Sequence, residues 1–192
     1  FFKQKTAYEI VMWLEFRRVL FRSIALSKNK QRLAVAFTGP SNSGKTTLIV
    51  KVSSILQDQG FKVAIVKHDP KDKAMFDKEG KDSFKFSQTG ADVAVVSPNK
   101  TTIFKKQTSS IEEMIDIFDE FDFLLVEGLK TLPLPRICIS RNKLDDAYFD
   151  VSDTLAIDDS INQNDVPEGM NILDLNNSDE IVQWIKNNAK KV

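Results

Sequence analysis

A glycine-rich segment near the start of the chain holds the residues best suited to chemistry. Residues 39–46 read Gly-Pro-Ser-Asn-Ser-Gly-Lys-Thr and match the pattern G-x-x-x-x-G-K-[S/T] without a mismatch. The two glycines let the backbone curl so that its N–H groups converge on phosphate oxygens. The lysine of such a loop reaches the β- and γ-phosphates, and the hydroxyl after it binds Mg²⁺. The candidate nucleotide-binding residues are Gly39, Pro40, Ser41, Asn42, Ser43, Gly44, Lys45, Thr46 and Thr47.

A carboxylate that could complete this site follows an apolar run later in the chain. Residues 123–126 read Phe-Leu-Leu-Val, which predicts a buried strand, and Glu127 closes it. Ligands gather at the carboxyl edge of open parallel sheets, so Glu127 should face the phosphate loop. We therefore predict Lys45 and Glu127 as catalytic residues and Thr46 and Glu127 as Mg²⁺ ligands. Asp122 opens the same strand, so we interpret it as a turn or cap residue at the opposite edge.

The elements around the loop are those that such a site requires. Residues 33–38 form an apolar run that predicts a buried strand before the loop, and apolar residues recur at helical spacing over 48–56. Gly60 stands where a glycine ends a helix, and residues 61–66 predict the next strand. This order is a βαβ unit, which implies a right-handed crossover between parallel strands.

The remainder of the chain continues the alternation. The segment 67–88 is polar and charged, and the runs 93–97 and 101–105 flank Pro98-Asn99 and predict a hairpin. Residues 110–113 match a capping box that opens a helix. The further predicted strands are 123–126, 136–140, 155–157 and 172–173, and a closing helix contains Ile181, Trp184 and Ile185, with Lys186, Lys190 and Lys191 near its end. The fold class is α/β: a three-layer P-loop NTPase domain with a mostly parallel sheet and a β-hairpin insertion.

The composition excludes several classes of protein. The chain has 192 residues, with 27 basic and 27 acidic side chains, so we expect neither nucleic acid nor an anionic membrane surface as a partner. Its one cysteine, Cys138, lies in an apolar run and excludes a disulfide framework and a cysteine-built zinc site. No uninterrupted apolar run approaches about 20 residues, the length that spans a membrane. We expect a cytoplasmic protein.

Residues 1–23 differ from the rest of the chain. Back-translation of residues 3–10 and 14–23 gives codons that resemble a widely used short-read sequencing adaptor, with its variable index between them. We therefore expect 1–23 to be a non-native leader and 32–192 to form the domain. The leader holds five of the basic and two of the acidic residues, which leaves a net charge of −3 for the rest. Anion binding by the domain must then be local.

Several short motifs together resemble those of one family. Lys67-His68 directly follows the second predicted strand, and Asp77 precedes Gly80-Lys81-Asp82-Ser83. Gly90-Ala91 and the run Leu125-Val126-Glu127-Gly128-Leu129-Lys130 complete the set. With the phosphate loop, these residues resemble the MobB-type proteins of molybdopterin-guanine dinucleotide biosynthesis. The resemblance covers nearly all of 32–192 and is strongest before residue 140.

This resemblance implies an activity, a cofactor and a partner. Proteins of the family bind GTP with Mg²⁺, hydrolyse it slowly at best, form homodimers and assist the MobA-type guanylyltransferase that joins GMP to molybdopterin. It also implies that residues beside the loop line the mouth of the site, where they could receive a phosphate or another anionic ligand such as molybdopterin. These candidates are Lys67, His68, Asp77, Lys81 and Asp82.

Two segments are candidates for reading the guanine base. Asn142-Lys143-Leu144-Asp145 matches the N-K-x-D motif of regulatory GTPases, in which the Asp carboxylate accepts from guanine N1–H and the exocyclic amine. Asp158 and Asp159 follow the apolar run 155–157, where the family has a strand ending in acid. Asp145 and Asp159 are the rival predictions.

Two other functions fit the loop less well. A small-molecule P-loop kinase is expected to carry an arginine-bearing lid, but after Gly39 only Arg136 and Arg141 occur. A dimeric scaffold with a vestigial loop would have no need of Lys45 and Thr46. The GTP-binding adaptor is therefore the preferred reading, with slow GTP hydrolysis as its upper limit of enzymatic activity.

Overall fold

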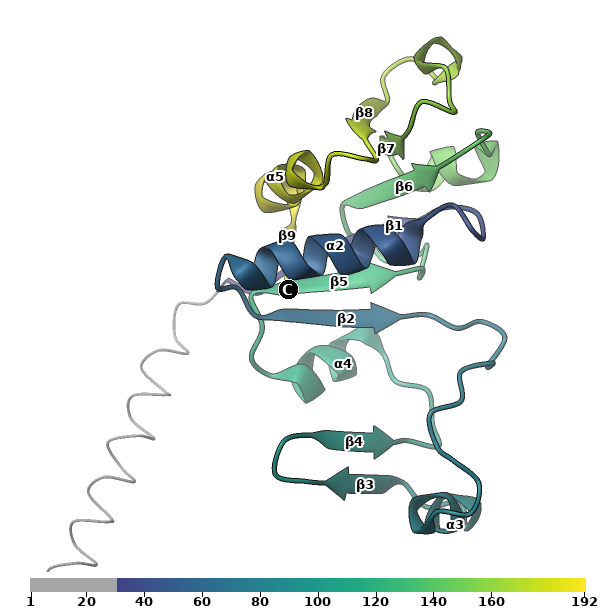
Figure 1. The fold of residues 1–192 in the computed structure, drawn as a ribbon, viewed down its shortest axis with the longest axis vertical. Helices are drawn as coiled ribbons and strands as arrows, with labels where there is room; N and C mark the ends of the chain where they lie inside the picture. The colour runs from purple at the N-terminus through teal and green to yellow at the C-terminus, as the bar shows by residue number, and fades with distance from the viewer. Residues whose placement is uncertain (1–30) are drawn as a thin grey trace, which may run out of the picture.

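The structure is a computed structural model that describes residues 31–192, so the expected leader at 1–23 lies outside the described residues. Its centre is a parallel sheet of six strands in the order β2-β5-β1-β6-β7-β8, with β9 beside β1 (Figure 1). The strands are β1 (Leu33–Thr38), β2 (Val63–Lys67), β5 (Phe123–Glu127), β6 (Arg136–Ser140), β7 (Thr154–Ile157) and β8 (Asn171–Asp174). The predicted strands and the mostly parallel sheet are confirmed.

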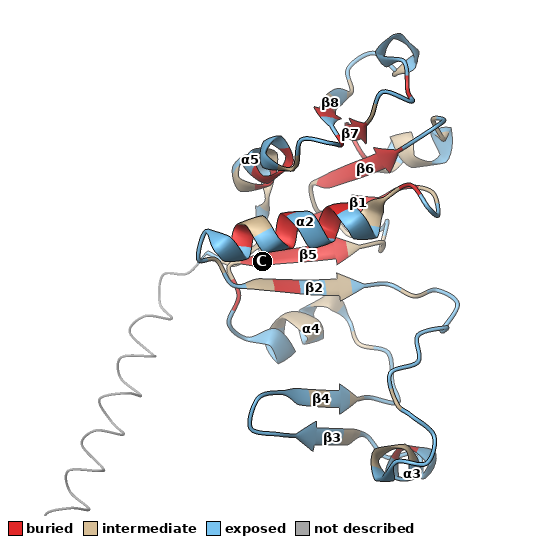
Figure 2. Ribbon diagram, in the orientation of Figure 1, coloured by how far each residue is buried: buried red, intermediate tan, exposed pale blue. Residues whose placement is uncertain are grey.

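Helices cover both faces of this sheet and make the three predicted layers. On one face, α2 (Lys45–Asp58) and α5 (Ser178–Asn188) pack over a core that includes Val35, Phe37 and Leu125. On the other face, α4 (Ile111–Phe118) sets Ile111 and Ile115 against a cluster that includes Ala34 and Leu124. The buried residues concentrate in β1, β5, β6 and β7, as Figure 2 shows, so the core is built around the strand that leads into the phosphate loop.

Local sequence signals set the ends of the helices. The α2 helix ends at Asp58, and Gly60 follows with φ 87° while its N–H donates to the carbonyl of Gln57 at 2.9 Å. A left-handed glycine in this position ends helices because it has no Cβ to clash. The predicted helix start at Ser110 is also confirmed, because the Ser110 hydroxyl accepts from the Glu113 N–H at 3.2 Å, while the Glu113 carboxylate accepts from Lys105 Nζ at 3.2 Å.

The hairpin forms a small sheet apart from the main one. The strands β3 (Val93–Val96) and β4 (Thr101–Phe104) pair antiparallel around the predicted turn. The sequence predicted only a polar segment before them, but a short helix, α3 (Asp82–Gln88), forms there and packs beside β3. Figure 1 shows α3, β3 and β4 together, away from the face that α2 covers.

The end of the chain differs from the prediction. Helix α5 stops at Asn188, and Lys190–Lys191 form the short strand β9, which runs antiparallel to Leu33 and Ala34 of β1. Because β6 pairs only with the second half of β1, β9 fills the free place beside its first half. Lys186 alone of the three lysines lies in the last turn of the helix. Two 3₁₀ helices complete the fold, η1 (Asp146–Val151) and η2 (Gln163–Asp165).

No helix within residues 31–192 has the length and apolarity that crossing a membrane requires.

A buried arginine holds the loop that follows the Glu127 strand. Arg136, the first residue of β6, is 2% exposed. Its Nη1 donates to the carbonyl of Gly128 at 2.9 Å, and its Nη2 donates to those of Leu129 at 2.9 Å and Leu132 at 3.2 Å. Leu129 itself has φ 47°, a conformation that costs a residue with a Cβ about 1–2 kcal/mol. The guanidinium therefore offsets strain in a loop that starts directly after Glu127.

We expect Arg136→Met to destabilise the protein by about 2–4 kcal/mol, because three partly buried carbonyls would lose hydrogen bonds from a charged donor. Urea unfolding followed by far-UV circular dichroism measures this change. Lys51→Met removes an exposed cation of α2 and serves as the control, with a change of at most about 0.5 kcal/mol. Equal stability of the two variants would contradict a structural role for the guanidinium.

A candidate nucleotide-binding site at the β1–α2 turn

The backbone of the phosphate loop runs too close to the sheet to carry a side chain at its first position. Gly39 has φ 136°, and a Cβ built on it would lie 2.2 Å from the carbonyl oxygen of Ile139 in β6. Gly44 has φ 97° and Asn42 has φ 64°, so three residues of the loop adopt left-handed conformations. This curled path is what a loop needs in order to direct successive N–H groups to one point.

The first turn of α2 is left open for an anion. Gly44 is its N-cap and provides no side-chain hydrogen bond, and the first turn contains no acidic residue. The other long helices differ, because Ser110 caps α4 and Asn177 caps α5, and each has two acidic residues in its first turn. A helix start carries free N–H groups and a partial positive charge. Among the described helices of eight or more residues, α2 alone has neither a side chain that caps these N–H groups nor an acidic residue in its first turn to balance this charge.

Lys45 lies folded over the loop. Its Nζ donates to the carbonyl of Gly39 at 3.0 Å and to that of Pro40 at 2.6 Å. Burial lowers the pKa of Lys45 from its ordinary value, while the charge of Glu127 acts in the opposite direction. An ammonium group has three donors, so one N–H remains for a further acceptor. The loop thus holds a cation at its centre.

The hydroxyl residues of the loop divide into buried and exposed ones. Ser43 is buried, and its Oγ has no hydrogen-bond partner among the described residues. Ser41 and Asn42 are exposed, as are Thr46 and Thr47 in the first turn of α2. Five of the predicted residues therefore offer oxygen or nitrogen atoms that the protein does not itself use fully.

Glu127 reaches the same edge of the sheet from the neighbouring strand. In the register of the sheet it is paired with Phe37 of β1 on one side and with Lys67 of β2 on the other. Its side chain is only 13% exposed, and Lys67 Nζ lies 3.7 Å from its Oε2. Asp122 lies at the opposite end of β5, where its carboxylate accepts from the Lys62 N–H at 2.7 Å, as the sequence predicted.

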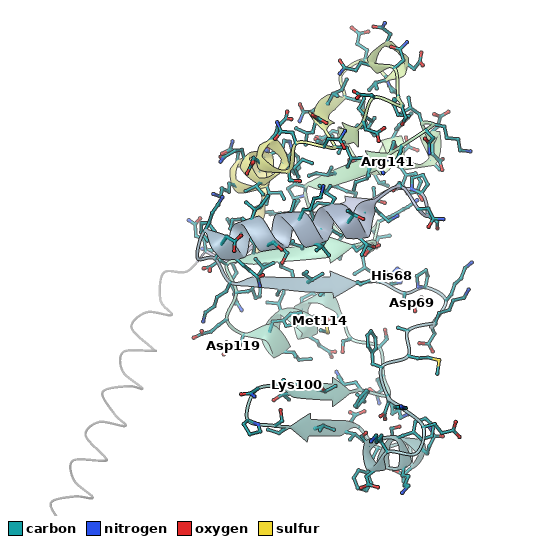
Figure 3. All side chains as sticks on the ribbon, in the orientation of Figure 1. His68, Asp69, Lys100, Met114, Asp119 and Arg141 are labelled. Atoms are coloured by element: carbon teal, nitrogen blue, oxygen red, sulfur yellow. The ribbon has the colours of Figure 1, made fainter. Side chains whose placement is uncertain are left out.

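His68 stands beside Glu127 and contacts the chain after it. The N–H of His68 donates to the carbonyl of Glu127 at 2.9 Å. A Cβ on Gly128, which has φ 92°, would lie 3.0 Å from the Cβ of His68. Figure 3 shows His68 at the edge of the sheet to which the strands point. The structure therefore brings Lys67 and His68 together beside Glu127, whose charge opposes the lowering of the pKa of Lys45 by burial in the phosphate loop.

The other residues expected at the mouth of the site lie elsewhere. Asp77 accepts from the Ser83 hydroxyl at 2.9 Å and from the Lys78 N–H at 3.0 Å. Lys81 is the N-cap of α3 and Asp82 its first residue. Both line an open hollow of about 510 Å³ between α3 and β3, with Ser83 and Phe86. The structure thus groups Asp77, Lys81 and Asp82 with the hairpin and not with residues 39–47 (Figure 1).

The two candidate guanine readers lie in the loops that follow two different strands. Asp145 follows β6, and its carboxylate accepts from the Ala147 N–H at 3.2 Å, where it caps η1. Asp159 follows β7, one strand further from β1, and is exposed. The Asp159 carboxylate makes no hydrogen bond or ion pair with any other described residue.

A link between the two loops that carry these residues was not predicted from the sequence. Arg141, directly after β6, has its Nε 2.6 Å from Oδ2 of Asp158, directly after β7. Hydrogen bonding to Ser160 holds the pKa of Asp158 below its ordinary value, and Arg141 adds to this effect. The sequence does show an arginine after one predicted strand and an acidic residue after the next. The two become neighbours only because β6 and β7 lie side by side in the sheet.

Known proteins resemble this chain over most of the described residues. The family model MobB, molybdopterin guanine dinucleotide synthesis protein B, matches residues 34–158. A molybdopterin-guanine dinucleotide biosynthesis adapter protein of Haemophilus influenzae is 31% identical over 121 residues, which are 60% of this chain and 67% of that protein. The protein of the same name from Escherichia coli K12 is 29% identical over 167 residues, 79% of this chain and 93% of its own.

A further relative is longer than this chain, and two solved structures share its fold. A relative in Methanocaldococcus jannaschii is 30% identical over 131 residues, and the chain spans about half of it, 54%. The crystal structure of Bacillus subtilis MobB has a TM-score of 0.67 at 21% identity, with 82% of this chain and 98% of that chain covered. A second structure, of molybdopterin-guanine biosynthesis protein B, has a TM-score of 0.62 at 23% identity, with 81% and 97% covered. The fold, the loop and the family model agree, and the chain belongs to the MobB family of molybdopterin-guanine dinucleotide synthesis proteins.

Proposed function

We propose that this protein binds GTP with Mg²⁺ in the loop 39–47 and acts as an adapter that assists a MobA-type guanylyltransferase. The observation that carries the proposal is the open start of α2, which has no side-chain cap and no acidic residue in its first turn. Lys45 lies there, and the charge of the largely covered Glu127 carboxylate on the neighbouring strand β5 acts on it. Free N–H groups, a cation and a helix dipole directed to one point favour a phosphate group. The family membership supports the pathway.

The residues beside the loop also fit a magnesium ion. Mg²⁺ prefers oxygen ligands, and it is commonly held by one or two protein groups together with the phosphates of the substrate. The Thr46 hydroxyl and the Glu127 carboxylate are such a pair. Among the described residues, no group of three or more His, Cys, Asp or Glu side chains could hold a metal by itself. The metal would therefore be recruited with the nucleotide.

Hydrolysis is expected to be slow. Fast phosphoryl transfer in this class of site uses an arginine that reaches the transferred phosphate. From residue 33 to the end, the chain has two arginines. Arg136 is bound to loop carbonyls and Arg141 to Asp158. Neither is a mobile finger.

Lys45→Ala should lower the affinity for GTP with Mg²⁺ by about tenfold or more, because it removes the only ammonium inside the described loop. The fold should survive, since Lys45 contacts only two carbonyls of its own loop. Isothermal titration calorimetry measures the affinity and thermal unfolding measures the stability. The exposed Lys51→Ala on the same helix is the control. Unchanged GTP binding by the Lys45 variant would contradict the proposed site.

Asp159 is the better-supported reader of guanine. Its carboxylate is exposed and free of other described partners, whereas that of Asp145 already caps η1. A carboxylate can accept both guanine N1–H and the exocyclic amine, and adenine lacks this pair of donors.

Asp159→Asn should therefore abolish the preference for GTP over ATP, while Asp145→Asn should retain it. Asparagine is as good a helix cap as aspartate, so the second variant keeps η1 intact and is a matched control. Competition of each nucleotide against a fluorescent GTP analogue measures the preference. Loss of preference in the Asp145 variant alone would assign the N-K-x-D segment as the reader.

The hairpin supports a homodimer. A two-stranded sheet is marginally stable by itself in water, and this one exposes Val96 at 75%, Ile103 at 50% and the neighbouring Phe86 at 59%. Exposed apolar side chains that gather in this way mark interaction surfaces. A second copy of the chain would cover them.

The hollow between α3 and β3 shares Phe86 and Val96 with the surface proposed for a second copy, and it supports a site for an anionic pterin at the edge of that interface. Lys81 lies at its rim, and Asp82 and Ser83 add hydrogen-bonding groups. A lysine ammonium and a hydroxyl are suitable contacts for the phosphate of molybdopterin. Asp77, Lys81 and Asp82 thus remain candidates for binding an anionic ligand, at a site away from the nucleotide loop.

The adapter role predicts that the protein retains a purified MobA-type guanylyltransferase. Immobilised protein, loaded with GTP and Mg²⁺, should capture the transferase at micromolar concentrations, which is the range of a transient complex. The Lys45→Ala variant tests in parallel whether capture needs the nucleotide. Absence of capture with and without GTP would contradict the adapter role.

A further inference from the structure

The guanidinium of Arg141 lies beside the phosphate loop without belonging to it. Arg141 follows β6, the neighbour of β1, and its Cζ lies 3.9 Å and its Nη1 4.0 Å from the place of a Cβ on Gly44. Gly44 is the N-cap of α2. Figure 3 shows Arg141 at the same edge of the sheet as His68. A second cation therefore stands at the start of α2, opposite the side from which Glu127 comes.

The Arg141 side chain is held by a contact at the Nε edge of its guanidinium. Its Nε lies 2.6 Å from Oδ2 of Asp158, which is 15% exposed. Among the described residues, none accepts a hydrogen bond from Nη1 or Nη2. The arginine side chain is 41% exposed, so its outer edge faces solvent next to the loop. A guanidinium fixed at Nε presents its two Nη groups as a fork that matches phosphate oxygens.

The anchor of Arg141 is itself part of a rigid link between two loops. Asp158 accepts from the Ser160 N–H at 3.1 Å and hydrogen-bonds the Ser160 hydroxyl. The Ser160 Oγ also accepts from the N–H of Asn142 at 2.7 Å, and Asn142 has φ 66°. The turns after β6 and β7 are thereby joined by two contacts, Arg141 with Asp158 and Asn142 with Ser160, and the Asp158–Ser160 bonds tie these two contacts together. Such a network fixes the position of the guanidinium before a ligand binds.

The direction of the nucleotide follows from the proposed function, on which this inference rests. Lys45 and the Mg²⁺ ligands place the γ-phosphate toward Glu127, on the β5 side of β1. The nucleoside must then leave on the other side, across β6 toward β7, where Asp159 lies. Arg141 stands between the loop and that strand. The part of the ligand that passes it is the link between the β-phosphate and the ribose.

We propose that Arg141 is a nucleotide-binding residue whose Nη groups contact the α-phosphate, and that Asp158 is the positioning residue that orients it. The α-phosphate is common to nucleoside di- and triphosphates. The contact therefore contributes to affinity for both and carries no information on hydrolysis. It also explains why a cation is fixed here by an acidic partner at Nε, which leaves the N–H donors of both Nη groups for a ligand.

The test compares binding of GTP and GDP, each with Mg²⁺, to the full chain and its variants. Arg141→Ala should weaken both nucleotides by a similar factor of about tenfold or more, the usual value of a charged hydrogen bond. Lys51→Ala removes an exposed cation of α2 that belongs to none of the proposed binding segments, and it should leave both affinities unchanged. Normal GTP and GDP binding by Arg141→Ala, or a loss confined to GTP, would overturn the assignment.

A purely structural role makes different predictions for Asp158. If Asp158 orients Arg141, Asp158→Asn alone weakens GDP binding. Added to Arg141→Ala, the same substitution causes no further loss of GDP binding. Losses that add in the double variant would overturn the positioning role. Arg141→Lys, which keeps the charge but not the fork, should recover only part of the affinity, and its melting temperature without nucleotide reports that the fold is intact. If the unsubstituted protein bound neither GTP nor GDP, the proposed function would fail, and this inference with it. If the Arg141 variants bound both nucleotides as tightly as the unsubstituted protein, only this inference would fail.

Discussion

The close approach of the β1–α2 turn to strand β6 is the constraint on which the site depends. Gly39 brings its Cα against the carbonyl of Ile139, where a Cβ would lie 2.2 Å from the oxygen. Because β1 lies at the centre of the sheet, this contact fixes the loop relative to β5 on one side and β6 on the other. Glu127 and Arg141 can face the loop from opposite sides because their strands are its immediate neighbours.

Local features would have to hold a phosphate group at this site, since the net charge of residues 24–192 would oppose its binding. Residues 24–192 have a net charge of −3. The chain offsets this at one point by leaving the start of α2 uncapped, while it caps α4 and α5 with side chains and acidic first turns. Arg136 works at the same edge in another way, because it secures the loop after Glu127 without facing the ligand. Two arginines with different partners thus serve binding and stability separately.

The parts of the fold with periodic or motif signals could be predicted from sequence, and the others could not. The apolar runs identified β1, β5 and β6, and the hairpin and the helix start at Ser110 were also predictable. Helix α3 was missed because seven polar and aromatic residues show no helical face. Strand β9 was missed because Lys190 and Lys191 pair through their backbone, which side-chain patterns do not report. The contact of Arg141 with Asp158 depends on strand order alone.

The most direct test of this account is a crystal structure of the protein with a slowly hydrolysed GTP analogue and Mg²⁺. The account predicts a triphosphate at the start of α2, with Lys45 Nζ moved from the carbonyls of Gly39 and Pro40 to phosphate oxygens, and with the base beyond β6. A nucleotide bound elsewhere, or a triphosphate in the loop with Lys45 still on both carbonyls, would contradict it.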